Sequence, residues 1–146
     1  RGFNRLRQDA RAELADLRHR IEEAYYADCG IRTVRVTGVE IDPGLVANLR
    51  ELFGWHWRCT SAPAAAKAVA IEMYRQSIGG TKAAFQIAAE VSKVTGASIY
   101  DAKIFLYEAI WNRELIVDLF APLLIVQPLT ASRRDPLVVY SEWLRR

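Results

Sequence analysis

The first 28 residues carry apolar side chains at steps of three and four. The apolar positions are 6, 10, 14, 17, 21, 24 and 25, a spacing typical of one face of an amphipathic helix. Gly30 follows the last of them, and a glycine just past a periodic stretch commonly ends a helix. The pattern therefore predicts a helix over residues 4 to 28.

The pattern then changes to alternation. Val34 and Val36 alternate with polar residues such as Arg35, which predicts a half-buried strand over residues 31 to 37. A single strand leaves its backbone donors and acceptors unpaired. We therefore expect its partner strands to come from another chain or from a segment that precedes Arg1, and the absence of an initiator Met agrees with the second source.

A second helix is predicted after this strand. Asp42-Pro43 is typical of an N-cap followed by a proline in the first helical turn. Leucines at positions 45, 49 and 52 follow at helical spacing. We expect a helix of about three turns that ends near Gly54.

Residues 55 to 63 are predicted to connect two domains. His56 stands between two tryptophans there, which suggests either a functional histidine or a packed hinge. The packed hinge is favoured, because His19 is the only other histidine in the chain and a metal site needs several ligands.

Three more helices are predicted beyond the connector. The first covers residues 62 to 78. The second is capped by Thr81 and runs to about Thr95. The third is capped by Ser98, with Asp101 as the acidic partner of a capping box.

A hairpin is predicted after the third helix. Residues 115 to 120 and 123 to 127 are rich in β-branched and leucine side chains and flank Ala121-Pro122. Three helices followed by a hairpin is the order of elements in a winged helix. The sequence therefore predicts a winged-helix domain over residues 61 to 131.

The tail, residues 132 to 146, carries apolar and aromatic side chains among arginines. One interpretation is that it folds back on its own domain. The other is that it is a docking segment, in which Tyr140 and Trp143 bind a partner protein.

Composition limits the class of protein only loosely. The net charge is +3, the hydrophobic fraction is 51% and the charged fraction is 25%, which is typical of a globular protein. Two cysteines, Cys29 and Cys59, are too few for a disulfide framework, so a reduced cytoplasmic setting is expected. No apolar run approaches the ~20 residues of a membrane span.

Contact with DNA is the first candidate function, because a winged helix commonly places its third helix in the major groove. Acids and bases balance on that helix, so strong sequence-specific reading is not expected, and a protein partner suits the surface equally well. The third helix is expected to expose Asp101, Lys103, Tyr107, Glu108, Asn112 and Arg113. The residues predicted to touch phosphate or acidic partners are Arg32, Arg35, Lys82, Lys93, Lys103 and Arg113.

Catalysis has weaker support. Glu40 and Asp42 flank the turn after the predicted strand, and two acids near a strand end can bind Mg²⁺. The favoured interpretation is that Asp42 caps a helix and Glu40 is solvated. No catalytic residue and no metal ligand is therefore assigned.

Three segments of the chain resemble TnsA, the endonuclease subunit of heteromeric transposases. They are Tyr25-Tyr-Ala-Asp-Cys-Gly-Ile31, Val36-Thr-Gly-Val-Glu-Ile41 and Asn48-Leu-Arg-Glu-Leu52. Residues 62 to 130 are similar to the carboxy-terminal winged helix of that family, including Asn112-Arg-Glu-Leu-Ile-Val-Asp-Leu119 and Pro122-Leu123. Gly38 departs from the family, which commonly has a polar or acidic residue there.

The resemblance implies an α+β fold that is mainly helical. Residues 1 to 60 would be the remnant of a restriction-endonuclease-like α/β domain, followed by the winged helix. The parent enzyme would nick transposon ends with Mg²⁺, together with a transposase subunit and an AAA+ ATPase regulator on double-stranded DNA. The family's catalytic acids and Gln-x-Lys element lie upstream of the matched region, so this segment is not expected to cut DNA.

Three functions therefore stay open. The first is DNA positioning and partner docking within a transposon-end endonuclease. The second is a free-standing winged-helix regulator or adaptor, in which residues 1 to 60 form a helical dimerisation arm. The third is a structural assembly role carried by the tail.

Overall fold

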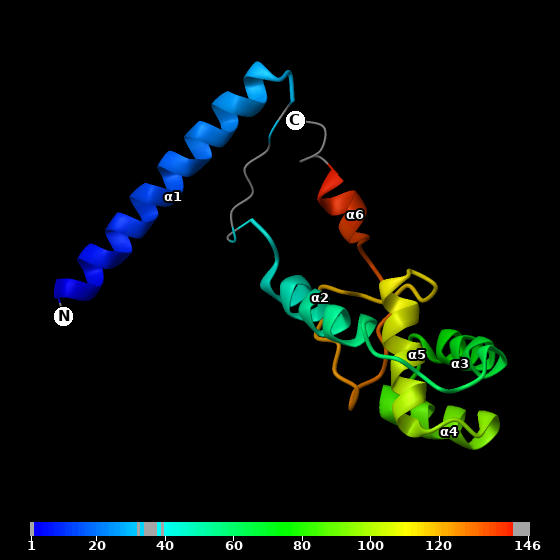
Figure 1. Cartoon of the computed structure of the whole chain (residues 1–146). Coiled ribbons are helices and arrows are strands. Elements are labelled where there is room, and N and C mark those ends of the chain that lie inside the picture. The colour runs from blue at the N-terminus through cyan, green and yellow to red at the C-terminus, as the bar shows by residue number, and fades with distance from the viewer. Residues whose placement is uncertain (1, 32, 34–37, 39, 142–146) are drawn as a thin grey trace. The chain divides into compact units, whose positions relative to one another are not determined.

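The computed structural model describes residues 2–31, 33, 38 and 40–141 (Figure 1). The predicted strand over residues 31 to 37 lies largely outside the described residues, as do Arg32, Arg35 and Trp143. The described chain is mainly helical, as the sequence predicts. Its helices are α1 (Gly2–Asp28), α2 (Pro43–His56), α3 (Ala64–Ser77), α4 (Ala84–Thr95), α5 (Ile99–Trp111) and α6 (Pro136–Val139).

The chain divides into two compact units, residues 1–36 and 37–145. The first unit contains α1, which ends where the sequence predicts. Gly30 adopts a φ of 69°, a left-handed conformation that glycine tolerates. The Ile31 amide donates to the Tyr26 carbonyl at 2.8 Å, which satisfies one of the carbonyls left over at a helix end.

In the second unit, Asp42 caps α2, as predicted. Its carboxylate accepts from the amides of Gly44 at 2.8 Å and Leu45 at 3.1 Å. The predicted end of this helix near Gly54 is wrong, because α2 continues to His56. The last turn is held by aromatic packing against α5, described below.

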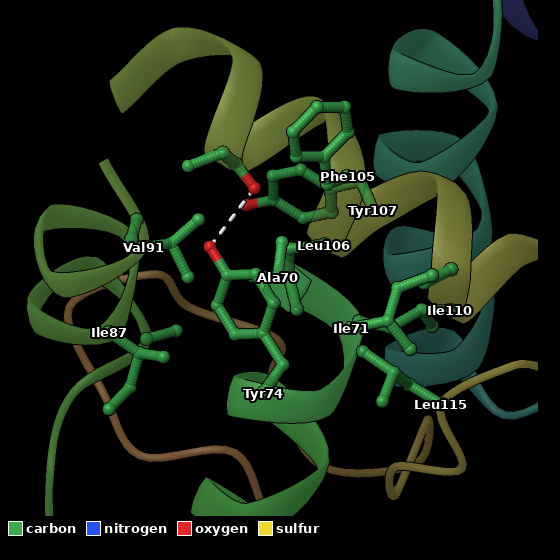
Figure 2. Close-up of a cluster of buried hydrophobic side chains, with 14 of the residues drawn as sticks. Ala70, Ile71, Tyr74, Ile87, Val91, Phe105, Leu106, Tyr107, Ile110 and Leu115 are labelled. Atoms are coloured by element: carbon green, nitrogen blue, oxygen red, sulfur yellow. Dashed lines mark hydrogen bonds between the residues drawn. The ribbon is translucent and has the colours of Figure 1, made fainter. Parts of the chain in front are cut away.

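The core of the second unit lies among α3, α4 and α5 (Figure 2). Tyr74 of α3 lies at its centre, fully buried, with its hydroxyl donating to the Ala102 carbonyl of α5 at 3.0 Å. Burial raises the pKa of Tyr74 above its ordinary value, so it stays a neutral donor. Around it pack Ala70, Ile71, Ile87, Val91, Phe105, Leu106, Ile110 and Leu115.

The predicted N-cap is confirmed for α5 and is wrong for α4. Ser98 accepts from the Asp101 amide at 3.0 Å, as predicted. Thr81 does not cap α4; the N-cap is Ala83, whose amide donates to the Gln86 side chain at 2.9 Å. The helix begins later because Ala83 forms an antiparallel bridge with Pro128.

The prediction of two hairpin strands over residues 115–120 and 123–127 is wrong. Among the described residues, β-pairing is limited to two isolated antiparallel bridges, Ala83 with Pro128 and Val117 with Ala131. The carbonyls of Ile125 and Gln127 instead accept from the amides of Phe85 and Ala84 at 2.8 and 2.9 Å. Those amides open α4 and have no partner within the helix, so the 123–127 segment caps α4 rather than pairing with residues 115–120.

The described part of the tail folds back on the second unit. Asp135 caps the short helix α6 through the Leu137 amide at 2.9 Å. The Tyr140 hydroxyl accepts from the Asp42 amide at 3.0 Å, at the start of α2. This agrees with the first of the two interpretations of the tail.

Candidate functional site

Helix α2 covers the face of α5 that a winged helix would present to DNA. The Trp55 ring stacks on Tyr107 with centroids 4.9 Å apart and planes 17° apart, and it also contacts Tyr100 at 5.7 Å. The expectation that Tyr107 is exposed is therefore wrong: only 5% of it is accessible. Stacked aromatic pairs of this kind add stability beyond the area that they bury.

The last turn of α2 extends this cover to the end of α5. The His56 ring stacks on Trp111 at 5.2 Å and contacts Trp57 edge-on at 5.1 Å. Phe53 also contacts Trp111, at 6.0 Å. The Nδ1 atom of His56 is buried without a hydrogen-bond partner, which agrees with the packed hinge.

Polar contacts from the connector and from α3 also reach α5. Thr60 donates to Asp101 at 2.7 Å, and the Ser98 and Thr60 hydrogen bonds lower the pKa of the Asp101 carboxyl. Lys67 of α3 pairs with Glu108 at 2.8 Å. Acidic Asp101 and Glu108 of α5 are therefore engaged within the protein.

The predicted phosphate-binding lysines that the structure describes differ in their surroundings. Lys82 pairs with Glu90 at 2.7 Å, and the Lys103 ammonium lies 5.6 Å from the centre of the Phe85 ring. Lys93 is exposed near the end of α4. A phosphate would compete with Glu90 for Lys82.

Arg113 is exposed, as expected, and it also contacts the tail. Its guanidinium meets the Asp135 carboxylate in a fork at 3.1 and 2.6 Å. Bidentate pairs of this kind are the stronger charge-assisted hydrogen bonds. The Arg113 guanidinium, followed by the Leu137 amide, holds the pKa of the Asp135 carboxyl below its usual value.

This pair should make attachment of the tail sensitive to acid. A lowered folded-state pKa means that the contribution is present above the unfolded value of about 3.9 and is lost as pH falls through the folded value. We expect the Leu137 amide resonance to stay constant from neutral pH down to about pH 5 and to shift below about pH 4. Asp135→Asn should remove the transition, whereas Asp101→Asn, at a distant carboxylate, should retain it.

Asn48 links α2 to the loop that follows α5. Its side-chain amide donates to the carbonyls of Leu119 and Ala121, both at 2.8 Å, and its oxygen accepts from the Leu123 amide at 3.0 Å. The residue is 6% exposed. Three hydrogen bonds from one buried side chain fix this loop against α2.

An apolar groove of about 380 Å³ lies beside this link. It is formed by α2, the end of α5 and the tail. Arg113 is the charged residue at its edge, and the other lining residues are Leu45, Leu49, Leu52, Ile110, Trp111, Leu119, Pro136, Leu137 and Tyr140. Such a groove suits the apolar side chains of a peptide or helix.

Exposed apolar side chains continue from the groove. On the outer face of α2, Val46, Leu49, Phe53 and Trp57 follow at steps of three and four, with Trp57 71% exposed. On α6, Leu137 is 66% exposed. A continuous exposed apolar surface of this kind marks a protein interaction site more often than a catalytic one. We call the groove and these side chains the α2–α6 surface.

The pair of acids after the predicted strand is engaged structurally. The Asp42 carboxylate caps α2. Within the described part of the chain, no three His, Cys, Asp or Glu side chains come together as a metal site would need.

Sequence reasoning missed Asn48 and Trp55, the two residues that attach α2. The buried face of α2 is formed by Leu45, Asn48 and Leu52, whereas Leu49, expected inside, is 40% exposed. A polar residue between leucines gives no signal of burial unless its partners are known. Those partners lie more than 70 positions later in the chain.

Comparisons with family models, with curated proteins and with solved structures found no match to this chain. Among the described helices, none is both long enough and apolar enough to cross a membrane. Both cysteines are free and exposed.

Proposed function

We propose that this chain is a protein-docking module built on a winged helix, the carboxy-terminal part of a TnsA-like transposon-end endonuclease. Its main role is to bind another protein of the transposition complex, the transposase subunit or the AAA+ ATPase regulator. It adds a few phosphate contacts to double-stranded DNA. The observation that carries the proposal is the α2–α6 surface, which is apolar, grooved and exposed.

The winged-helix part of the proposal is supported by the order of elements and by the two bridges. In that fold an extended segment lies between the first two helices and pairs with the last strand. Ala83 stands in that position between α3 and α4, and it pairs with Pro128. Val117, after α5, pairs with Ala131. Residues 128–131 therefore lie between the other two segments, with residues 118 to 127 as the wing.

The proposed docking role is supported by the fact that α2 covers α5. The helix that would enter the major groove is covered by Trp55, Phe53 and His56 of α2. Reading bases requires side chains that reach base edges, and the covered face has none to offer. The chain's own chemistry is therefore binding and positioning; Mg²⁺-dependent cleavage belongs to the proposed upstream part of the parent enzyme.

Surface variants test the docking role directly. Leu137→Asp and Leu49→Asp each place a charge on the α2–α6 surface. We expect each to weaken binding to a purified transposase subunit or AAA+ ATPase regulator by about tenfold or more, the effect of losing one apolar anchor. Isothermal titration would measure it.

Val94→Asp is the matched control, because Val94 is 66% exposed, as is Leu137, but lies on α4. It should leave the affinity unchanged. Equal losses in all three variants would mean that the α2–α6 surface is not the docking site. Absence of binding by the wild-type chain to either protein would contradict the proposed role itself.

The alternative function, a free-standing winged-helix DNA-binding regulator, predicts a different salt dependence. A regulator with six to ten phosphate contacts has a slope of log K against log salt of about −5 to −9. With Lys82 and Arg113 already paired, we expect a slope shallower than about −3. Fluorescence anisotropy on a duplex across a salt series decides between the two.

A further inference from the structure

Helix α1 carries an apolar stripe that its own unit leaves exposed. Leu14 is 69% exposed, Leu17 52% and Ile21 62%. An amphipathic helix gains most of its stability from burying such a stripe. We therefore expect another helix to pack on this apolar stripe.

The spacing of the stripe is that of a heptad repeat. With Leu14 and Ile21 at the a positions, Ala10, Leu17 and Ala24 fall at the d positions. Residues at a and d form the buried seam of a two-stranded coiled coil. Five successive seam positions between residues 10 and 24 are therefore apolar.

The charges beside the seam indicate the occupant and its direction. In a parallel pair, a g residue faces the e residue five positions later on the other helix. Glu13 is at g and Arg18 at e, so each copy's Glu13 faces the other copy's Arg18. In an antiparallel pair e positions face e positions, which brings Arg18 opposite Arg11 or Arg18 of the second helix, and g positions face g positions, which brings Glu13 opposite Arg20. The repulsive and attractive pairs then offset each other, so the parallel pair has the more favourable charge pattern.

We propose that α1 pairs with α1 of a second copy of this chain as a parallel two-stranded coiled coil. The pair forms through apolar layers at positions 10 to 24 and is oriented by two Glu13–Arg18 contacts between the copies. The seam is short, so the dimer is reversible and forms with rising concentration. This proposal does not depend on the docking role of the α2–α6 surface, and either can fail alone.

Sedimentation of the full chain across a concentration series tests the pairing. We expect a monomer–dimer equilibrium in the wild type. Ile21→Asp should lower the association constant by about 100-fold, because two carboxylates would enter one apolar layer. Ala12→Asp, at an f position on the outer side, should leave it unchanged. A wild type that stays monomeric at all concentrations, or equal effects of the two variants, overturns the proposal.

Charge exchange tests the orientation. Glu13→Arg or Arg18→Glu alone turns two attractive contacts into repulsive ones and should weaken the dimer about tenfold. The double variant should restore it, although Arg18→Glu also removes the contact of Arg18 with Glu22 within α1. Because the double variant loses this contact within the helix, a recovered association constant cannot be attributed to a more stable helix. Circular dichroism would measure the helix content of each variant. Failure of the double variant to recover overturns the parallel pairing.

Cross-linking gives an independent reading. In a Cys29→Ser, Cys59→Ser background, Ala24→Cys places one thiol at a d position. A parallel dimer brings the two thiols together, and mild oxidation should yield a covalent dimer. An antiparallel dimer keeps the two thiols apart. A dimer that forms but does not cross-link would therefore overturn the parallel orientation.

Discussion

Replacing Asn48 by leucine is expected to cost about 2 to 4 kcal/mol of folding stability. The two residues have similar size, so packing changes little, but all three hydrogen bonds of the side chain are lost. The carbonyls of Leu119 and Ala121 and the amide of Leu123 then have to find water or remain unpaired. Leaving buried polar groups unpaired costs more than the bonds contribute. Urea unfolding followed by circular dichroism would measure the loss.

The matched control is Asn112→Leu, the same substitution at an exposed asparagine just past α5. Exposed positions of this kind usually change stability by less than about 0.5 kcal/mol. Because Asn48 also fixes one wall of the groove, Asn48→Leu should weaken partner binding as well. A stability change no larger than that of Asn112→Leu would mean that the loop is not held by this side chain.

The sequence predicts the helices well where the signal is local. Gly30 and Gly96 end α1 and α4 in left-handed conformations, and Asp42 and Ser98 cap α2 and α5. Each of these depends on hydrogen bonds within five residues. Nothing distant has to be known to place them.

The errors arise where distant segments compete for the same groups. Residues 123–127 have the composition of a strand, yet two of their carbonyls cap α4, which begins about 40 positions earlier. Tyr107 has the spacing of an exposed helical residue, yet Trp55 covers it. Neither outcome can be read from a local pattern, because the deciding partner lies in another element.

The structure locates an apolar groove that the sequence does not predict. A protein partner was weighed equally with DNA because charges on α5 balance, and the tail was considered as its docking segment. The described tail instead folds back and forms one wall of the groove with α2. Two of the six residues predicted to touch phosphate are paired with acids, Lys82 with Glu90 and Arg113 with Asp135.

The cover of α2 over α5 makes a second large effect predictable. Trp55→Ala removes the ring that stacks on Tyr107, the contact with Tyr100 and the position of Arg58 over the ring. Truncating a buried Trp costs about 3 to 5 kcal/mol, and this one is half-buried, so we expect about 2 to 3 kcal/mol. Trp55→Phe is the matched control, since it retains an aromatic face and loses the indole contact with Glu51.

The destabilisation by Trp55→Ala should affect α2 before it affects the rest of the second unit. Hydrogen exchange in Trp55→Ala should speed up across α2, while the amides of α3 and α4 keep their protection, because the Tyr74 core does not depend on Trp55. The affinity of the same variant for duplex DNA then distinguishes two explanations of the role of α5. If α2 is what keeps α5 from the major groove, Trp55→Ala binds DNA more tightly than Trp55→Phe. If the two bind alike, α5 is a packing helix even when uncovered, and its acidic excess, Asp101 and Glu108 against Lys103, explains why.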